Sequence, residues 1–123
     1  MILVTGGLGM EEPQPLYADD GGDNCYAPDA GRAIALLTTA QTLRHNTYNV
    51  SSGRPFINRE LADAVQAITP GLRLDLRPGR QAGPGDNPYL DTTRLTNETG
   101  FAPAFDIAAA VADYVAWRAG NPR

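Results

Sequence analysis

Apolar residues recur at the spacing i, i+3, i+4 and i+7 in three stretches of this chain, and that spacing places them on one face of a helix. Each stretch begins with an Asp or Asn whose side chain can accept hydrogen bonds from the free N–H groups of a first helical turn. The expected helices cover residues 29–43, 58–69 and 106–118, with Asp29, Asn58 and Asp106 as their caps.

Two shorter stretches alternate apolar and polar residues, which is the pattern of a half-buried strand. They are Tyr48–Val50 and Leu72–Leu76. After the first, Gly53 and Pro55 stop a strand before the helix expected from Asn58. The centre of the chain therefore predicts a strand, a tight turn and a helix.

A further short helix is expected after Tyr89. Asp91 or Thr92 can cap its first turn and Gly100 can end it. Phe101 is then expected to fold back on Leu95, as apolar residues do beyond a glycine at a helix end.

The first ten residues, Met1–Met10, are apolar and then glycine-rich, and they predict a buried strand that runs into a glycine turn. Residues 11–23 are acidic, carry prolines and glycines, and show neither helical nor strand periodicity, so we expect a linker there. Residues 24–123 hold the other expected elements and form the main lobe. A length of 123 residues is enough for one domain.

Composition excludes several classes of function. A net charge of -4 argues against a nucleic-acid surface, which needs clustered positive charge. No apolar run approaches the ~20 residues of a membrane span, and the start of the chain does not resemble a signal peptide, so the cytoplasm is the expected compartment. With Cys25 and His45 as single residues of their types, no metal site is expected.

All ten basic residues are arginine, so the chain contains no lysine. Any mechanism that needs a lysine is therefore excluded for this chain alone. Cys25 is expected to be a small buried apolar residue, and His45 a surface residue in a polar turn, because neither has a visible activating partner.

Four segments together resemble the NAD-dependent epimerase/dehydratase family, the extended short-chain dehydrogenases. "YNVSSGRP" is similar to the family's "YNVGSGRP", "NCYAPDAGRAIALL" to "VxVxDVARAIxLL", "YLDTTRL" to "YxDxxK/RL", and the opening "TGGLG" to the start of "TGxxGxxG". The resemblance implies an α/β fold: a fragment of a Rossmann-type NAD(P)-binding fold with the small carboxy-terminal substrate lobe. It also implies NAD or NADP as cofactor and a nucleotide sugar as ligand.

In that family the glycine turn holds the cofactor pyrophosphate, and the matching positions here are Thr5, Gly6, Gly7 and Gly9. The third glycine of the motif is replaced by Glu12, whose charge would repel a pyrophosphate. Prolines at positions 13 and 15 would interrupt the helix that should follow. We interpret residues 11–23 as a junction at which about 150 residues of a typical dinucleotide-binding enzyme are missing.

A loop rich in glycine and proline, residues 78–88, stands where the family places an arginine-containing "RPGD" loop that contacts the diphosphate of a nucleotide sugar. The last three letters match here, but the arginine position is Gly83, so that role could pass only to Arg77 or Arg80, with Asp86 near the end of the loop. The alternative is that both arginines are solvated side chains beside a flexible loop.

The family's proton transfer uses a YxxxK pair, in which the lysine lowers the pKa of the tyrosine. Without lysine this pair cannot be built, so no catalytic residue is assigned. Three readings remain open: a substrate lobe without turnover, an enzyme part completed by another chain, and a small binding or assembly module that forms a homo-oligomer.

Overall fold

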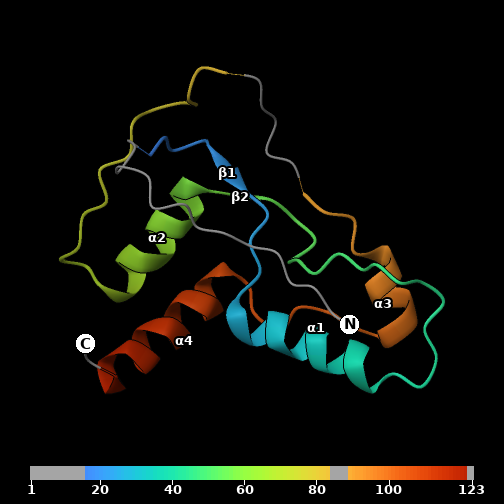
Figure 1. The fold of residues 1–123 in the computed structure, drawn as a ribbon. Coiled ribbons are helices and arrows are strands. Elements are labelled where there is room, and N and C mark those ends of the chain that lie inside the picture. Colours follow the sequence, from blue (N-terminus) through green and yellow to red (C-terminus); the bar gives the residue numbers. More distant parts are fainter. Residues whose placement is uncertain (1–15, 84–88, 122–123) are drawn as a thin grey trace.

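The computed structural model describes residues 16–83 and 89–121. The expectations for Met1–Met10, and for Asp86, lie outside these residues. The described part is mostly helical with one small sheet, in the order β1 (Gly21–Gly22), α1 (Ala27–Thr39), β2 (Phe56–Ile57), α2 (Asn58–Ile68), α3 (Thr93–Thr99) and α4 (Ile107–Gly120). α2 packs against α4 and α1 against α3, so the helices form two pairs (Figure 1).

The sheet is an antiparallel pair in which Gly21 lies opposite Ile57 and Gly22 opposite Phe56. β1 falls in the segment that was expected to be a linker. The two strands approach so closely at Gly21 that a Cβ atom there would lie 1.8 Å from the carbonyl oxygen of Phe56. A glycine is therefore required at this position of β1.

Neither of the strands predicted from alternation forms. Tyr48–Val50 is irregular, and so is most of Leu72–Leu76, with Leu72 45% and Leu74 39% exposed. The nearest ladder contact is an isolated parallel bridge between Tyr17 and Arg77. Alternation predicts which side chains can share a face, but a strand also needs a neighbour, and within the described residues these segments lack one.

α1 begins two residues before Asp29, with Tyr26 at its cap position and Pro28 in its first turn. The predicted cap at Asp29 is therefore wrong. The carboxylate of Asp29 instead accepts hydrogen bonds from the backbone N–H of Ala104 at 2.9 Å and of Phe105 at 3.1 Å. The residue is only 2% exposed, and it ties the start of α1 to the segment that leads into α4.

α1 also ends at Thr39 rather than near Leu43. The hydroxyls of Thr38 and Thr39 donate to the carbonyl oxygen of Ala35, and Ala40 is extended. Threonine is a weak helix former because its branched side chain restricts rotation and its hydroxyl competes for backbone groups.

The cap predicted at Asn58 is also wrong, because Ile57 occupies the cap position of α2. Glu60 Oε2 accepts a hydrogen bond from the backbone N–H of Ile57 at 2.9 Å. The side-chain amide of Asn58 donates instead to the carbonyl oxygen of Tyr17 at 2.8 Å, which holds the segment before β1 against α2.

Both ends of α3 and the start of α4 follow the sequence prediction, whereas α4 runs to Gly120, two residues beyond the expected end. Asp106 accepts a hydrogen bond from the N–H of Ala109 at 2.8 Å, and Asp91 accepts one from the N–H of Thr93 at 2.8 Å. α3 ends at Gly100, whose φ of 70° lies in the left-handed region that glycine tolerates.

The buried core of the described part is small and lies between α1 and α3. Ala33 and Leu95 are fully buried and Phe101 is 1% exposed, so the predicted return of Phe101 onto Leu95 is confirmed. Tyr48 and Val50 pack against this cluster although they form no strand. No helix in the described ranges is long and apolar enough to cross a membrane.

An apolar cavity between α2 and α4 as the candidate functional site

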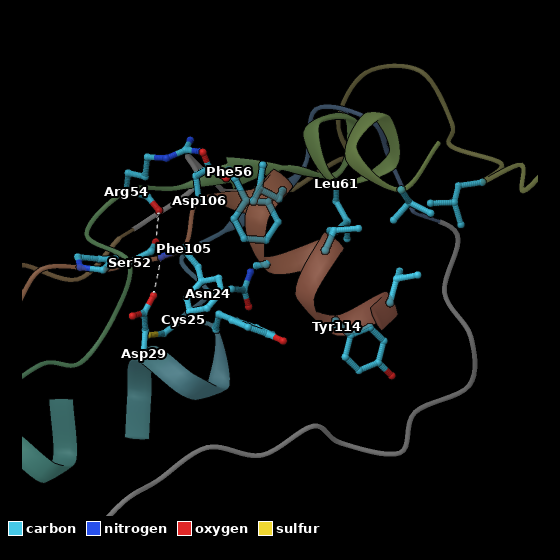
Figure 2. Close-up of a pocket in the computed structure, with 18 of the residues that line it drawn as sticks. Asn24, Cys25, Asp29, Ser52, Arg54, Phe56, Leu61, Phe105, Asp106 and Tyr114 are labelled. Carbon is cyan, nitrogen blue, oxygen red and sulfur yellow. Dashed lines mark hydrogen bonds between the residues drawn. The ribbon is translucent and has the colours of Figure 1, made fainter. Parts of the chain in front are cut away.

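A cavity of about 570 Å³ opens between α2, α4 and the segment that precedes α1 (Figure 2). Its apolar wall comes from successive turns of the two helices, since Leu61 and Val65 are four residues apart on α2, as are Ile107 and Val111 on α4. Tyr114 lies one turn beyond Val111 and is 51% exposed. The helical periodicity seen in the sequence therefore predicted these faces, but not that they would border an open cavity.

One end of the cavity is polar. Ser52 and Arg54 come from the turn that precedes β2, and Asp29 from α1 (Figure 2). The hydroxyl of Ser52 has two acceptors within hydrogen-bond distance, the carboxylate of Asp23 at 3.0 Å and the carbonyl oxygen of Arg54 at 2.8 Å. The guanidinium of Arg54 lies 3.5 Å from the carboxylate of Glu60 and remains 53% exposed. The cavity can therefore accept an apolar body with a polar group at this end.

Cys25 lines the same cavity and is partly exposed. Burial raises the pKa of its thiol, and the negative charges of Asp29 and Asp23 raise it further. A protonated thiol is a poor nucleophile, so this environment suits an unreactive cysteine.

The tyrosines near hydrogen-bonding carboxylates are also poor bases. The phenol of Tyr26 donates to the carboxylate of Asp113 at 2.7 Å, which raises its pKa to about 12. Burial raises the pKa of Tyr48, and a hydrogen bond to Glu98 adds to the effect. Both environments favour the neutral phenol, whereas a catalytic tyrosine of the expected kind needs a lowered pKa.

The residues expected to hold the cofactor, Thr5, Gly6, Gly7 and Gly9, lie outside the described part. Within it, a pyrophosphate would need another cradle. A helix amino terminus is the usual cradle for such a group. Every helix of residues 16–83 and 89–121 already carries a carboxylate in or next to its first turn: Asp29, Glu60, Asp91 and Asp106. None of these four helix amino termini suits the pyrophosphate of NAD or NADP, because the carboxylates would repel it.

Of the residues expected to contact substrate, Arg77 and Arg80 lie in the described part, and neither lines the cavity. The guanidinium of Arg77 sits over the ring of Tyr17, 5.8 Å from its centroid. Arg80 is exposed in the loop that follows. The structure does not test whether they bind a diphosphate, and this role stays a prediction.

His45 lies in the polar turn after α1, and its side chain is 40% exposed, as the sequence suggested. Its Nδ1 contacts Glu98 of α3, a contact between residues 53 positions apart that local sequence could not predict. No group of three or more His, Cys, Asp or Glu residues in the described part could hold a metal ion.

The fold is similar to those of several solved structures, among them L-threonine dehydrogenases. It matches L-threonine dehydrogenase from Phytophthora infestans with a TM-score of 0.70 at 21% identity, over 85% of this chain and 35% of that one. The GalE-like L-threonine dehydrogenase from Cupriavidus necator, in its holo form, matches with a TM-score of 0.65 at 25% identity, over 82% of this chain and 34% of that one. RMD from Pseudomonas aeruginosa complexed with NADPH matches with a TM-score of 0.56 at 21% identity, over 82% of this chain and 35% of that one.

The chain thus spans about a third of the length of the solved structures it resembles. Comparison with protein-family models and with curated proteins gives no match. The described part is a mixed α/β unit with the fold of about a third of these solved structures, which agrees with the broad α/β expectation from the sequence.

Proposed function

We propose that this chain is the substrate-side lobe of an NAD(P)-dependent oxidoreductase or epimerase of the extended short-chain dehydrogenase type, and that it has no turnover by itself. The observation that carries the proposal is a fold likeness that covers 85% of this chain but only 35% of an L-threonine dehydrogenase. The cofactor sheet and the Tyr/Lys pair would have to come from another polypeptide segment, because this chain contains no lysine.

The chemistry of the described residues supports the absence of turnover. The pKa of Tyr26 and that of Tyr48 are raised, and the thiol of Cys25 is held protonated. None of these three groups is poised to remove a proton near neutral pH.

The experiment is an assay of the purified chain with NAD⁺ or NADP⁺ and a substrate panel. The panel contains L-threonine, because several of the solved structures with this fold are L-threonine dehydrogenases. It also contains nucleotide sugars, because the sequence motifs point to them. We expect no reduced cofactor above the buffer control and no new sugar product, while an intact L-threonine dehydrogenase turns over in parallel. Turnover of about one per second that copurifies with this chain would overturn the proposal.

A second candidate, an assembly module, is favoured by the open cavity. Its wall exposes a large apolar area along α2 and α4, and such patches commonly mark contact surfaces. In this reading the wall faces another copy of the chain. Ala110→Arg places a charge in the cavity wall, whereas Ala112→Arg places the same charge on an exposed position of the same helix outside the wall.

Sedimentation equilibrium separates the two candidates. An assembly module predicts a dimer for the native chain and for Ala112→Arg, and a monomer for Ala110→Arg. A monomer in all three proteins would exclude self-association through this face.

A further inference from the structure

We propose that a second, polar cavity between the end of α1 and α3 binds the phosphate group of a small phosphorylated molecule. This cavity has a volume of about 370 Å³, and Arg44 and Arg94 both line it. It shares no lining residue with the apolar cavity, so the proposal does not depend on the function proposed above.

The two arginines bring positive charge to this cavity. The charge of Arg94 also acts on Asp91, whose pKa is lowered first by hydrogen bonds to Thr93 and then by this arginine. Neither guanidinium forms an ion pair with a carboxylate of the described residues, although Arg32, Arg54 and Arg59 each do. Both arginine residues are exposed at the cavity. A guanidinium presents its N–H donors in a planar fork that matches two oxygens of a phosphate, so two guanidinium groups at one cavity suit a dianion.

The one carboxylate at this cavity is already engaged. Glu98 accepts a hydrogen bond from the hydroxyl of Tyr48 at 2.6 Å and one from the backbone N–H of Arg44 at 2.8 Å, and its second oxygen contacts His45. Glu98 keeps its negative charge, but the cavity lining holds two guanidinium groups against this one carboxylate. The cavity therefore keeps a positive balance.

The same contacts position the two arginines. Arg94 lies on α3 four residues before Glu98, and Glu98 holds the backbone of Arg44 through the 2.8 Å bond. The backbones of two arginines that are 50 positions apart in the sequence are thus held at one short helix, so a ligand has to order only their side chains.

The remaining lining indicates the kind of ligand. Thr42, Thr93 and Asn97 add hydroxyl and amide groups, and His45 is the only ring among the lining residues of this cavity. A volume of 370 Å³ falls within the range of small-molecule sites and exceeds what one phosphate needs. These polar walls hold no large aromatic ring, so they suit a sugar phosphate better than a nucleobase.

Titration calorimetry and amide chemical shifts at low salt test the proposal with glucose 6-phosphate, orthophosphate, AMP and glucose. We expect saturable binding of glucose 6-phosphate, weaker binding of orthophosphate, no binding of glucose, and shifts at Thr42, Thr93 and Asn97. AMP binding as tight as that of glucose 6-phosphate would show that only the phosphate is recognised and would overturn the sugar preference.

Arg44→Gln and Arg94→Gln should each weaken binding about tenfold or more, as expected for losing a charge-assisted hydrogen bond. Arg73→Gln, an exposed arginine outside the cavity, is the matched control for net charge and should change nothing. Equal weakening by all three variants would show general attraction of anions, and a native chain that binds none of the phosphates at millimolar concentration would also overturn the proposal.

Discussion

The hydroxyl of Tyr48 donates a 2.6 Å hydrogen bond to the carboxylate of Glu98, which joins the segment after α1 to α3 across 50 positions of sequence. Glu98 also accepts from the backbone N–H of Arg44. Tyr48 packs in turn against the small core of Ala33, Leu95 and Phe101. One carboxylate thus links the buried cluster to the loop that carries Arg44 and His45.

This arrangement makes the free energy of unfolding depend on pH. The hydrogen bond from Tyr48, followed by that from the Arg44 N–H, lowers the pKa of Glu98 from its ordinary value of 4.5 to about 2. A depressed carboxyl pKa stabilises the fold above pH 4.5, and this contribution disappears as the pH falls toward 2. Urea unfolding of the native chain and of Glu98→Gln should therefore differ at pH 7 and converge at pH 2. A constant difference at both values of pH would contradict the assignment.

Leu95, the one apolar residue of α3, should be costly to truncate, because it is fully buried between α1 and Phe101. Leu95→Ala is expected to lower the free energy of unfolding by about 3 kcal/mol, within the usual range for a buried leucine. Leu43→Ala is the control, since Leu43 is 37% exposed and should cost less than about 1 kcal/mol. Circular dichroism during urea unfolding measures both, and equal losses would show that the core does not lie where the structure has it.

Asp29 holds the segment before α4 to the start of α1. Asp29→Ala removes the buried carboxylate that accepts hydrogen bonds from the N–H groups of Ala104 and Phe105, so we expect a loss of about 2 kcal/mol in the free energy of unfolding, as for a hydrogen bond to a charged group. Asp29→Asn keeps one acceptor oxygen and should lose less. Asp63→Ala removes an exposed carboxylate of α2 and serves as the control. Equal stability of Asp29→Ala and Asp63→Ala would refute this role.

The β1–β2 pair offers a matched glycine test. A Cβ atom at Gly21 would collide with the backbone of Phe56, whereas one at Gly22 would meet nothing within 4 Å. Gly21→Ala should therefore cost about 1 to 3 kcal/mol, as overpacking usually does, and Gly22→Ala should have little effect. Thermal unfolding of both variants measures the contrast. If Gly22→Ala destabilises the protein more than Gly21→Ala does, the pairing of these strands is wrong.

The sequence predicted the helices because their signals are local. The cap at Asp106 and the end of α3 at Gly100 each depend on residues within one turn, and both are present. Asp29 and Asn58 are also capping residue types placed before a helical pattern. Each side chain instead forms a hydrogen bond with a distant backbone group, that of Ala104 for Asp29 and that of Tyr17 for Asn58. Local spacing cannot distinguish a polar side chain that caps its own helix from one that binds a distant backbone group.

Contacts between distant segments were beyond the reach of sequence patterns. β1 is a pair of glycines with no alternation to reveal it, and Leu72–Leu76 alternates well yet forms no strand. The polar cavity needs Arg44 and Arg94 at one place, which follows only from the packing of α1 against α3. The cavity between α2 and α4 depends likewise on how two predicted faces meet.

Cys25 should react slowly with alkylating reagents. Burial raises the pKa of the thiol, with Asp29 and Asp23 adding to the effect, so the thiolate fraction at pH 8 is below that of an exposed cysteine. Iodoacetamide labelling followed by mass spectrometry should be slower for the folded chain than for the same chain in urea, where the pKa returns to its ordinary value. Asp23→Asn removes one of the two charges and should speed labelling of the folded chain, while Asp63→Asn, outside the cavity wall, should not. Labelling of the folded chain as fast as in urea would mean that the thiol is neither buried nor held protonated. Cys25 would then be a candidate nucleophile.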